Sequence, residues 1–139
     1  MAQQQQLLKF SVHHYRLKTI PEENFKRWLH EYLAPTAAQI IKKHNIVKWS
    51  ITLSPVAMQQ AWEQELRTSM GKPPGWGMAD YDITTSYWVR DPDDMRRLLE
   101  DEDWAKFVSA VEVDWVDLDR ASILVGYETV FVDGGEIVG

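Results

Sequence analysis

The chain of 139 residues has no cysteine, which removes several kinds of chemistry at once. It can form no disulfide, and it has no thiolate to act as a nucleophile or to bind zinc or an iron–sulfur cluster. A protein without cysteine is well suited to a reducing compartment. We therefore expect a cytoplasmic protein.

Positive charge is also scarce. The 15 Lys and Arg residues face 21 Asp and Glu residues, the net charge is −6, and no basic block is present. A phosphate backbone would be repelled, so nucleic acid is not an expected partner. No apolar run reaches the roughly 20 residues of a membrane span, and the start of the chain lacks the charged and apolar parts of a secretion signal. We expect no membrane partner, and a disordered tail at residues 1–6.

Familiar cofactor and nucleophile motifs are missing as well. There is no phosphate-binding loop, no G-x-G-x-x-G fingerprint and no G-x-S-x-G elbow. The four histidines show neither H-x-H nor H-x-x-x-H spacing, so they offer no good set of metal ligands. These absences argue against a metal, against a nucleotide cofactor and against a hydrolase of the elbow type.

Aromatic residues, by contrast, are abundant, with seven Trp, five Tyr and four Phe. Such rings either fill a core or form the wall of a cavity for an apolar ligand, and composition does not separate the two roles. The length fits one domain of ordinary size over residues 1–139.

Hydrophobic spacing predicts an α+β domain. Alternation indicates strands, and apolar residues three and four apart indicate amphipathic helices, the first of which should bend near Pro35. We expect strands at residues 7–17, 46–54, 81–89 and 121–132 and helices at residues 19–45 and 91–108. An insertion at residues 55–79 separates the second strand from the third, and its Gly- and Pro-rich part, residues 71–78, is a candidate lid. The order βαββαβ is the ferredoxin-like pattern, an antiparallel sheet with both helices on one face.

The other face of the predicted sheet is too polar for a core and too aromatic for a solvated surface. Pairing two such faces would give a dimeric α+β barrel with a lined interior, so we expect a homodimer with a small-molecule substrate. On this face we expect Lys48, Ser50, Asp82, Ser86 and Trp88 to contact and orient the substrate, although a structural role is the alternative for each.

Two pairs of neighbouring residues are candidates for acid and base chemistry. His13 and His14 must point to opposite faces of the first strand, and alternation places His13 with Tyr15 on the polar face. Glu112 and Asp114 lie two apart, and in an extended loop they would face the same way, where burial would raise the pKa of at least one of them. The alternatives are a hydrogen-bonded structural histidine, a strand-end tyrosine and a solvated acidic loop.

Four segments carry a resemblance to a known family. They are FKRWLHEYLAP (residues 25–35), DYDITTSYWV (residues 80–89), EDEDWAKFV (residues 100–108) and EVDWVDLDRASILVGYETVFV (residues 112–132). The chain resembles the EthD domain over about residues 7–132, and in particular the small fungal decarboxylases and tailoring proteins of aromatic polyketide pathways. The resemblance implies a dimeric α+β barrel, no metal or organic cofactor, and lyase chemistry on an aromatic substrate.

The chain departs from that family at two positions. A histidine that the family carries before Ala-Pro is Leu33 here, and a second histidine near the last strand is Glu112, with its aromatic neighbour kept as Trp115. The resemblance places Leu33, Trp115 and Trp28 against the substrate. Since a carboxylate titrates near neutral pH only when desolvated or paired, the family mechanism does not transfer unchanged.

These observations predict a cofactor-independent lyase or cyclase of fungal secondary metabolism that acts on a polyketide-type aromatic intermediate. The loss of both family histidines favours cyclisation over decarboxylation, because folding a flexible substrate into a reactive conformer itself lowers the barrier. One alternative is a non-catalytic carrier that keeps the barrel. Another is a decarboxylase whose acid and base groups have moved.

Overall fold

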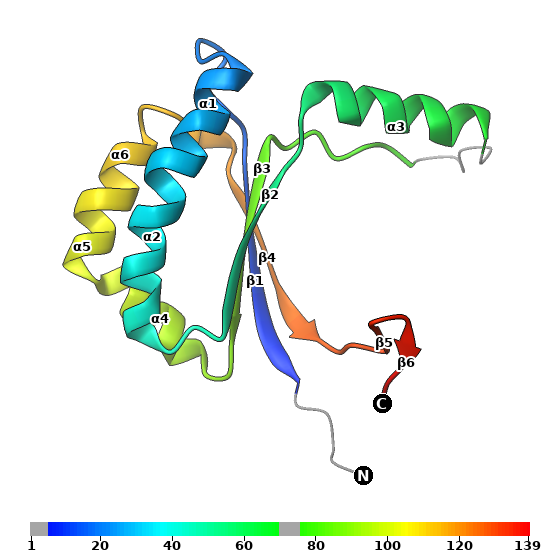
Figure 1. The fold of residues 1–139 in the computed structure, drawn as a ribbon. Coiled ribbons are helices and arrows are strands. Elements are labelled where there is room, and N and C mark those ends of the chain that lie inside the picture. Colours follow the sequence, from blue (N-terminus) through cyan, green and yellow to red (C-terminus); the bar gives the residue numbers. More distant parts are fainter. Residues whose placement is uncertain (1–5, 70–75) are drawn as a thin grey trace.

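In the computed structural model, which describes residues 6–69 and 76–139, two helical rods lie side by side on one face of a four-stranded sheet (Figure 1). Residues 1–5 of the predicted tail lie outside the described residues. The same is true of residues 71–75 of the predicted lid.

The sheet has the predicted ferredoxin-like topology. Its strands are β1 (Leu7–His14), β2 (Lys48–Leu53), β3 (Ile83–Val89) and β4 (Ser122–Glu128), in the antiparallel order β2-β3-β1-β4. The α+β class and the order of elements are therefore confirmed. All four strands are shorter than predicted, and β1 gives way after His14 to an isolated bridge between Arg16 and Val116.

The first rod follows β1. It consists of α1 (Glu22–Trp28), the π-helical turn η1 (Leu29–Leu33), α2 (Ala34–Ile41) and the short 3₁₀ turn η2 (Lys42–His44). Pro35 has no N–H to donate to the preceding turn, and the predicted irregularity appears there as the wider π turn. The rod ends at Asn45, whose φ of 58° is the left-handed conformation typical of a helix C-terminus.

The second rod follows β3. It consists of α4 (Pro92–Glu100), α5 (Glu102–Trp104), the π-helical turn η3 (Ala105–Ser109) and α6 (Ala110–Glu112), and the 3₁₀ turn η4 (Leu118–Arg120) leads on to β4. Asp91 and Asp101 begin α4 and α5, because each side chain accepts a hydrogen bond from the backbone N–H two residues later.

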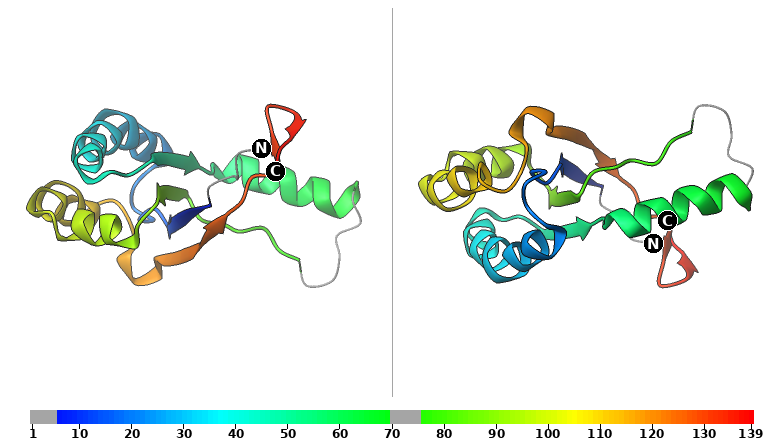
Figure 2. Two further views of the ribbon diagram at one scale, coloured as in Figure 1. Left: turned by 90° about the horizontal axis from the view of Figure 1, so that it is seen from below. Right: turned by 90° about the horizontal axis from the view of Figure 1, so that it is seen from above.

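Two elements project from the side of the sheet opposite the rods (Figures 1 and 2). The helix α3 (Val56–Thr68) belongs to the predicted insertion, and none of its residues is buried. The hairpin of β5 (Val132–Asp133) and β6 (Glu136–Ile137) was not predicted. Gly134 and Gly135 have φ of 59° and 81°, the positive values that a tight two-residue hairpin turn requires.

The core lies between the rods and the sheet. Phe10 and Val12 of β1 pack against it, whereas Ser11 and His13 point to the open face, as alternation predicts. The most deeply buried side chains of this layer are Phe25, Ile83, Leu98, Val89 and Val108. None of the described helices is long and apolar enough to cross a lipid bilayer.

Candidate functional site

The sheet divides the predicted site residues between its two faces. Val12 packs under the rods, so its neighbour His13 points to the open face. Glu112 instead ends α6 within the helix layer, on the side where Tyr87 belongs to the core. His13 and Glu112, both candidates for acid and base chemistry, therefore lie on opposite faces of the sheet of one chain.

An aromatic cluster fills the space between the rods and the sheet, and it consists of Trp28, Trp49, Tyr87, Trp104 and Trp115. Trp28 stacks on Trp115, with ring centroids 4.9 Å apart and planes inclined by 5°. The Tyr87 ring lies 6.3 Å from the ring of Trp49 and 6.3 Å from that of Trp104. The cluster therefore joins β2, β3 and both rods, and two of its members, Trp28 and Trp115, were predicted to contact substrate.

A buried polar atom of this cluster lacks a partner. The indole N–H of Trp28 is buried and has no hydrogen-bond partner within residues 6–69 and 76–139, whereas the indole N–H of Trp49 interacts with the side chain of Tyr87. A buried donor without a partner is costly, so it points to a group that the described residues do not supply. Burial raises the pKa of Tyr87 to about 12, so its hydroxyl stays protonated and can donate.

Glu112 supplies a titratable group beside the aromatic cluster. Burial raises the pKa of its carboxyl from the ordinary 4.5 to about 7. The carboxylate forms no hydrogen bond or ion pair within the part of the chain that the structure describes, so nothing there offsets the loss of water. A carboxyl group with this pKa exchanges a proton readily at neutral pH.

Asp114 does not join Glu112. The segment was expected to be extended, but Glu112 closes a helix and its backbone carbonyl accepts hydrogen bonds from the N–H groups of Trp115 and Val116, both at 2.9 Å. In a helical turn, residues two apart point to different sides. Asp114 is exposed, so the predicted carboxylate pair is wrong.

A cavity of about 250 Å³ opens beside the aromatic cluster at the edge of the sheet formed by β2. Its lining includes Trp49 and Ile51 of the sheet and Leu29 and His30 of the first rod. Trp49 lines this cavity and also packs on Tyr87, so the cavity borders the aromatic cluster. Leu33, the position of a family histidine, is buried in the adjoining core and offers only apolar surface.

On the open face, the two predicted acid and base groups already have partners. The Nδ1 atom of His13 lies 2.8 Å from the hydroxyl of Thr84, and the ring stacks on Tyr81 with centroids 4.4 Å apart. The Tyr15 hydroxyl donates to Asp80 at 2.6 Å, and this hydrogen bond raises the pKa of Tyr15. Both arrangements are those of structural side chains.

Trp88 is likewise occupied on the open face. Lys9 and Lys48 lie over its ring at 4.8 and 4.6 Å, and its indole N–H donates to Glu128 at 2.7 Å. In the next row of the sheet, Ser50 pairs with Ser86, and Ser86 pairs with Ser11. The predicted polar residues on these strands therefore do share one face, with small side chains along its middle.

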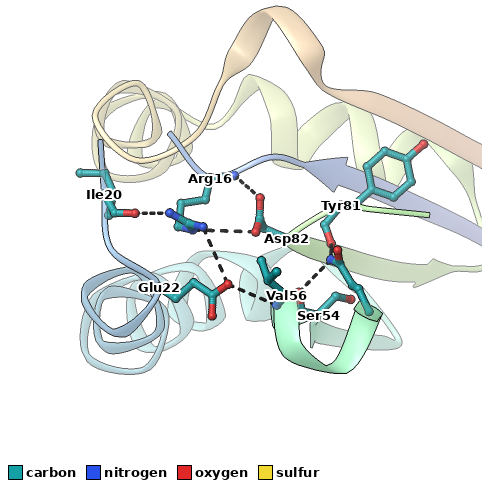
Figure 3. A network of polar contacts seen from close by, with 8 residues as sticks. Arg16, Ile20, Glu22, Ser54, Val56, Tyr81 and Asp82 are labelled. Carbon is teal, nitrogen blue, oxygen red and sulfur yellow. Dashed lines mark hydrogen bonds and ion pairs between the residues drawn. The ribbon is translucent and has the colours of Figure 1, made fainter. Parts of the chain in front are cut away.

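Asp82 takes part in a network of polar contacts with Arg16 (Figure 3). Its carboxylate accepts from the backbone N–H of Arg16 at 2.8 Å and forms an ion pair with the Arg16 guanidinium at 3.8 Å. Arg16 also pairs with Glu22, and Glu22 accepts from the N–H of Val56 at 3.2 Å. These contacts tie the base of α3 to the domain, so Asp82 has a structural role in this network.

The sequence reasoning missed Trp49 and Tyr87. Both lie on the helix-facing side of their strands and belong to the core. A tryptophan opposite a tyrosine on neighbouring strands was an available signal, because both bring a polar group that a core must satisfy.

Comparisons with known proteins agree with this architecture. The EthD domain matches residues 17–119. A protein of Pestalotiopsis fici named dehydratase iacD is 28% identical over 134 residues, covering 96% of this chain and 94% of that protein. A protein of Emericella nidulans named decarboxylase is 22% identical, covering 94% of this chain and 83% of that protein.

Solved structures show the same fold. One, described as a dimeric protein of ferredoxin-like fold from Bacteroides fragilis, has a TM-score of 0.54 at 12% identity and covers 89% of this chain and 96% of that chain. Another, an EthD family protein from Bacillus halodurans, has a TM-score of 0.52 at 10% identity, with 88% and 99% covered. With the family match spanning most of its length, the chain belongs to the EthD domain family.

Proposed function

We propose that the protein is a cofactor-independent lyase that removes water from an oxygenated, polyketide-type aromatic intermediate of fungal secondary metabolism. One observation carries the proposal: the Glu112 carboxyl, with its pKa raised to about 7, interacts electrostatically with Tyr87, in the same core that holds the unpaired indole N–H of Trp28. The names dehydratase and decarboxylase among the relatives support lyase chemistry in general.

Dehydration of a β-hydroxy ketone would take two proton transfers. The Glu112 carboxylate removes the proton from the carbon between the carbonyl and the hydroxyl-bearing carbon, and the C–H electrons form an enolate. The indole N–H of Trp28 and the Tyr87 hydroxyl are donors for the enolate oxygen. The enolate then expels the hydroxyl, which leaves as water with the proton held by Glu112, and the carboxylate is restored.

A single group near neutral pKa suits this sequence, because it must first accept a proton and then return it. Ring closure with loss of water uses the same two transfers, so the predicted cyclisation remains a form of the proposal. His13, Tyr15 and Asp114 have no step in it.

The test uses 3-hydroxy-1-tetralone, a bicyclic β-hydroxy ketone that loses water to give fluorescent 1-naphthol. We expect turnover by the wild type and a loss of at least about 100-fold in Glu112→Gln, which keeps the shape but not the proton exchange. Glu31→Gln, an exposed glutamate of the first rod, is the matched control. Equal turnover by wild type and Glu112→Gln would contradict the proposal.

A non-catalytic carrier is the second candidate, favoured by the loss of both family histidines. It predicts that wild type and Glu112→Gln bind 1-tetralone, which lacks the leaving hydroxyl, equally well by calorimetry and that neither forms 1-naphthol. We further propose that the protein acts in the cytoplasm as a homodimer, which the description of the Bacteroides fragilis protein as dimeric supports.

A further inference from the structure

The insertion between β2 and β3 forms an arm, made of α3 and residues 76–82, that the other described residues leave largely uncovered. The base of the arm is fixed, because the Gln59 side chain donates to the carbonyls of Ser54 and Tyr81, both at 3.0 Å. Beyond this base, α3 has no buried residue. The arm therefore has a set direction and a free surface.

The free surface of the arm is apolar along one side. Met58 and Trp62 lie four residues apart on α3, so they share one side of the helix, and they are 57% and 53% exposed. Gln64 lies on the opposite side of the helix and is polar. An anchored helix with exposed Met and Trp is suited to contact with another molecule.

A second uncovered surface lies on the open face of the sheet. This Gly126 hollow has a volume of about 270 Å³ and is lined by Lys9, Ser11, Leu124, Gly126, Tyr127 and Glu128. Leu124 is 64% exposed there.

The described residues do not explain a glycine at position 126. Its φ is not positive, and a Cβ added to it would meet nothing within 4 Å. Glycine weakens a strand, and within a strand it often marks the close approach of another group. The missing side chain therefore points to an occupant from outside.

No described residue of the arm lines the hollow of its own chain, but two copies can bring the two surfaces together. The arm projects from the side of the sheet away from the rods (Figure 2), and Gly126 pairs with Lys9 on the same open face. With 13 residues, α3 is about 20 Å long, whereas paired sheets lie about 10 Å apart. If two copies meet through their open faces, the first half of each arm, with Met58 and Trp62, lies level with the sheet of the other copy.

We infer that Trp62 of one copy enters the Gly126 hollow of a second copy and that the exchange is reciprocal. The exposed apolar surface is large enough. On the side away from the rods, seven large apolar side chains of the arm, the open face and the projecting hairpin are 53–88% exposed: Met58, Trp62, Trp76, Leu124, Phe131, Val132 and Ile137. At roughly 100 Å² each, they offer on the order of 700 Å² per copy, close to the amount that a standard interface buries on each partner. The inference rests on the proposed homodimer and is independent of catalysis by Glu112.

Three variants test this docking by size-exclusion chromatography with light scattering. Trp62→Glu and Gly126→Val should each raise the dissociation constant of the dimer at least about tenfold, whereas Gln64→Glu, the charge-matched control, should leave it unchanged. Gly126→Val should fold normally by circular dichroism, because valine favours a strand and the space is open.

A mixture of Trp62→Glu and Gly126→Val should regain dimer, because the mixed pair has one intact arm and one intact hollow. A dimer unaffected by either variant, or a mixture that stays dissociated, would overturn the exchange. So would a Gly126→Val protein that remains dimeric but no longer binds 1-naphthol, since the hollow would then hold a small molecule. A monomeric wild type would contradict both the proposed homodimer and the docking of Trp62 into the Gly126 hollow. The proposed catalytic role of Glu112 would still be tested separately by the turnover assay.

Discussion

Replacing Glu112 by glutamine should stabilise the protein at alkaline pH and leave its stability in acid almost unchanged. Burial raises the pKa of Glu112 from 4.5 to about 7 in the folded state. Between these values the folded protein holds a proton that the unfolded chain has released. The stability due to that proton is complete below pH 4.5 and is lost as the pH rises through 7.

The size of the effect follows from the two pKa values. The interval from 4.5 to about 7, at about 1.4 kcal/mol for each pH unit, corresponds to about 3 kcal/mol. Glutamine keeps the shape of the side chain and cannot ionise. Glu112→Gln should therefore exceed the wild type by up to about 3 kcal/mol in free energy of unfolding at pH 8, and by little at pH 4.

Urea unfolding followed by tryptophan fluorescence measures this difference at pH 4 and pH 8, on either side of the pI of about 5.1. Glu31→Gln serves as the control, because an exposed carboxylate has no lost hydration to regain. The same difference between Glu112→Gln and wild type at both pH values would refute the assignment of a desolvated carboxyl.

Three further changes test the core, a charged contact and the aromatic cluster. Leu98→Ala should lower the free energy of unfolding by about 2–5 kcal/mol in urea, because the side chain is fully buried, and a loss below about 1 kcal/mol would contradict that burial. The Asp101 carboxylate accepts a hydrogen bond from His44 at 2.6 Å, and this contact holds the pKa of Asp101 below its usual range. Asp101→Asn should therefore lower the melting temperature at pH 7, and the difference from the wild type should shrink below pH 3.8. A difference that stays constant with pH would argue against the ion pair. Trp28→Phe removes an unpaired N–H donor, so calorimetry should show about tenfold weaker binding of 1-tetralone. The binding of tetralin, which lacks the carbonyl, should be nearly unchanged. Equal weakening for both ligands would show that only the packing of the ring matters.

Most of the fold could be predicted because its signals are local. Alternation placed Phe10 and Val12 on one face of β1 and His13 on the other, and the structure confirms this division. The error at Asp114 has the same origin, since a period of two was assumed where the chain is helical. The hairpin after β4 was missed although Gly134 and Gly135 mark its turn, because the alternation was carried through to residue 132.

The candidate site was harder to predict because it depends on contacts distant in sequence. The identity of Glu112 suggested a role, but its raised pKa requires burial in the layer between the second rod and β3. Trp49 and Tyr87 were not singled out from the sequence, because only the three-dimensional surroundings reveal the unpaired N–H of Trp28 and the buried hydroxyl of Tyr87. No local pattern states which polar atoms of a core lack a partner.

A crystal structure of the protein with 1-naphthol bound would locate the ligand site. We predict the naphthol ring between the rods and the sheet, against Trp49 and Tyr87, with its hydroxyl near Glu112 or the Trp28 indole N–H. Density on the open face beside His13, with the aromatic cluster unchanged, would contradict the assignment of the site to the helix side.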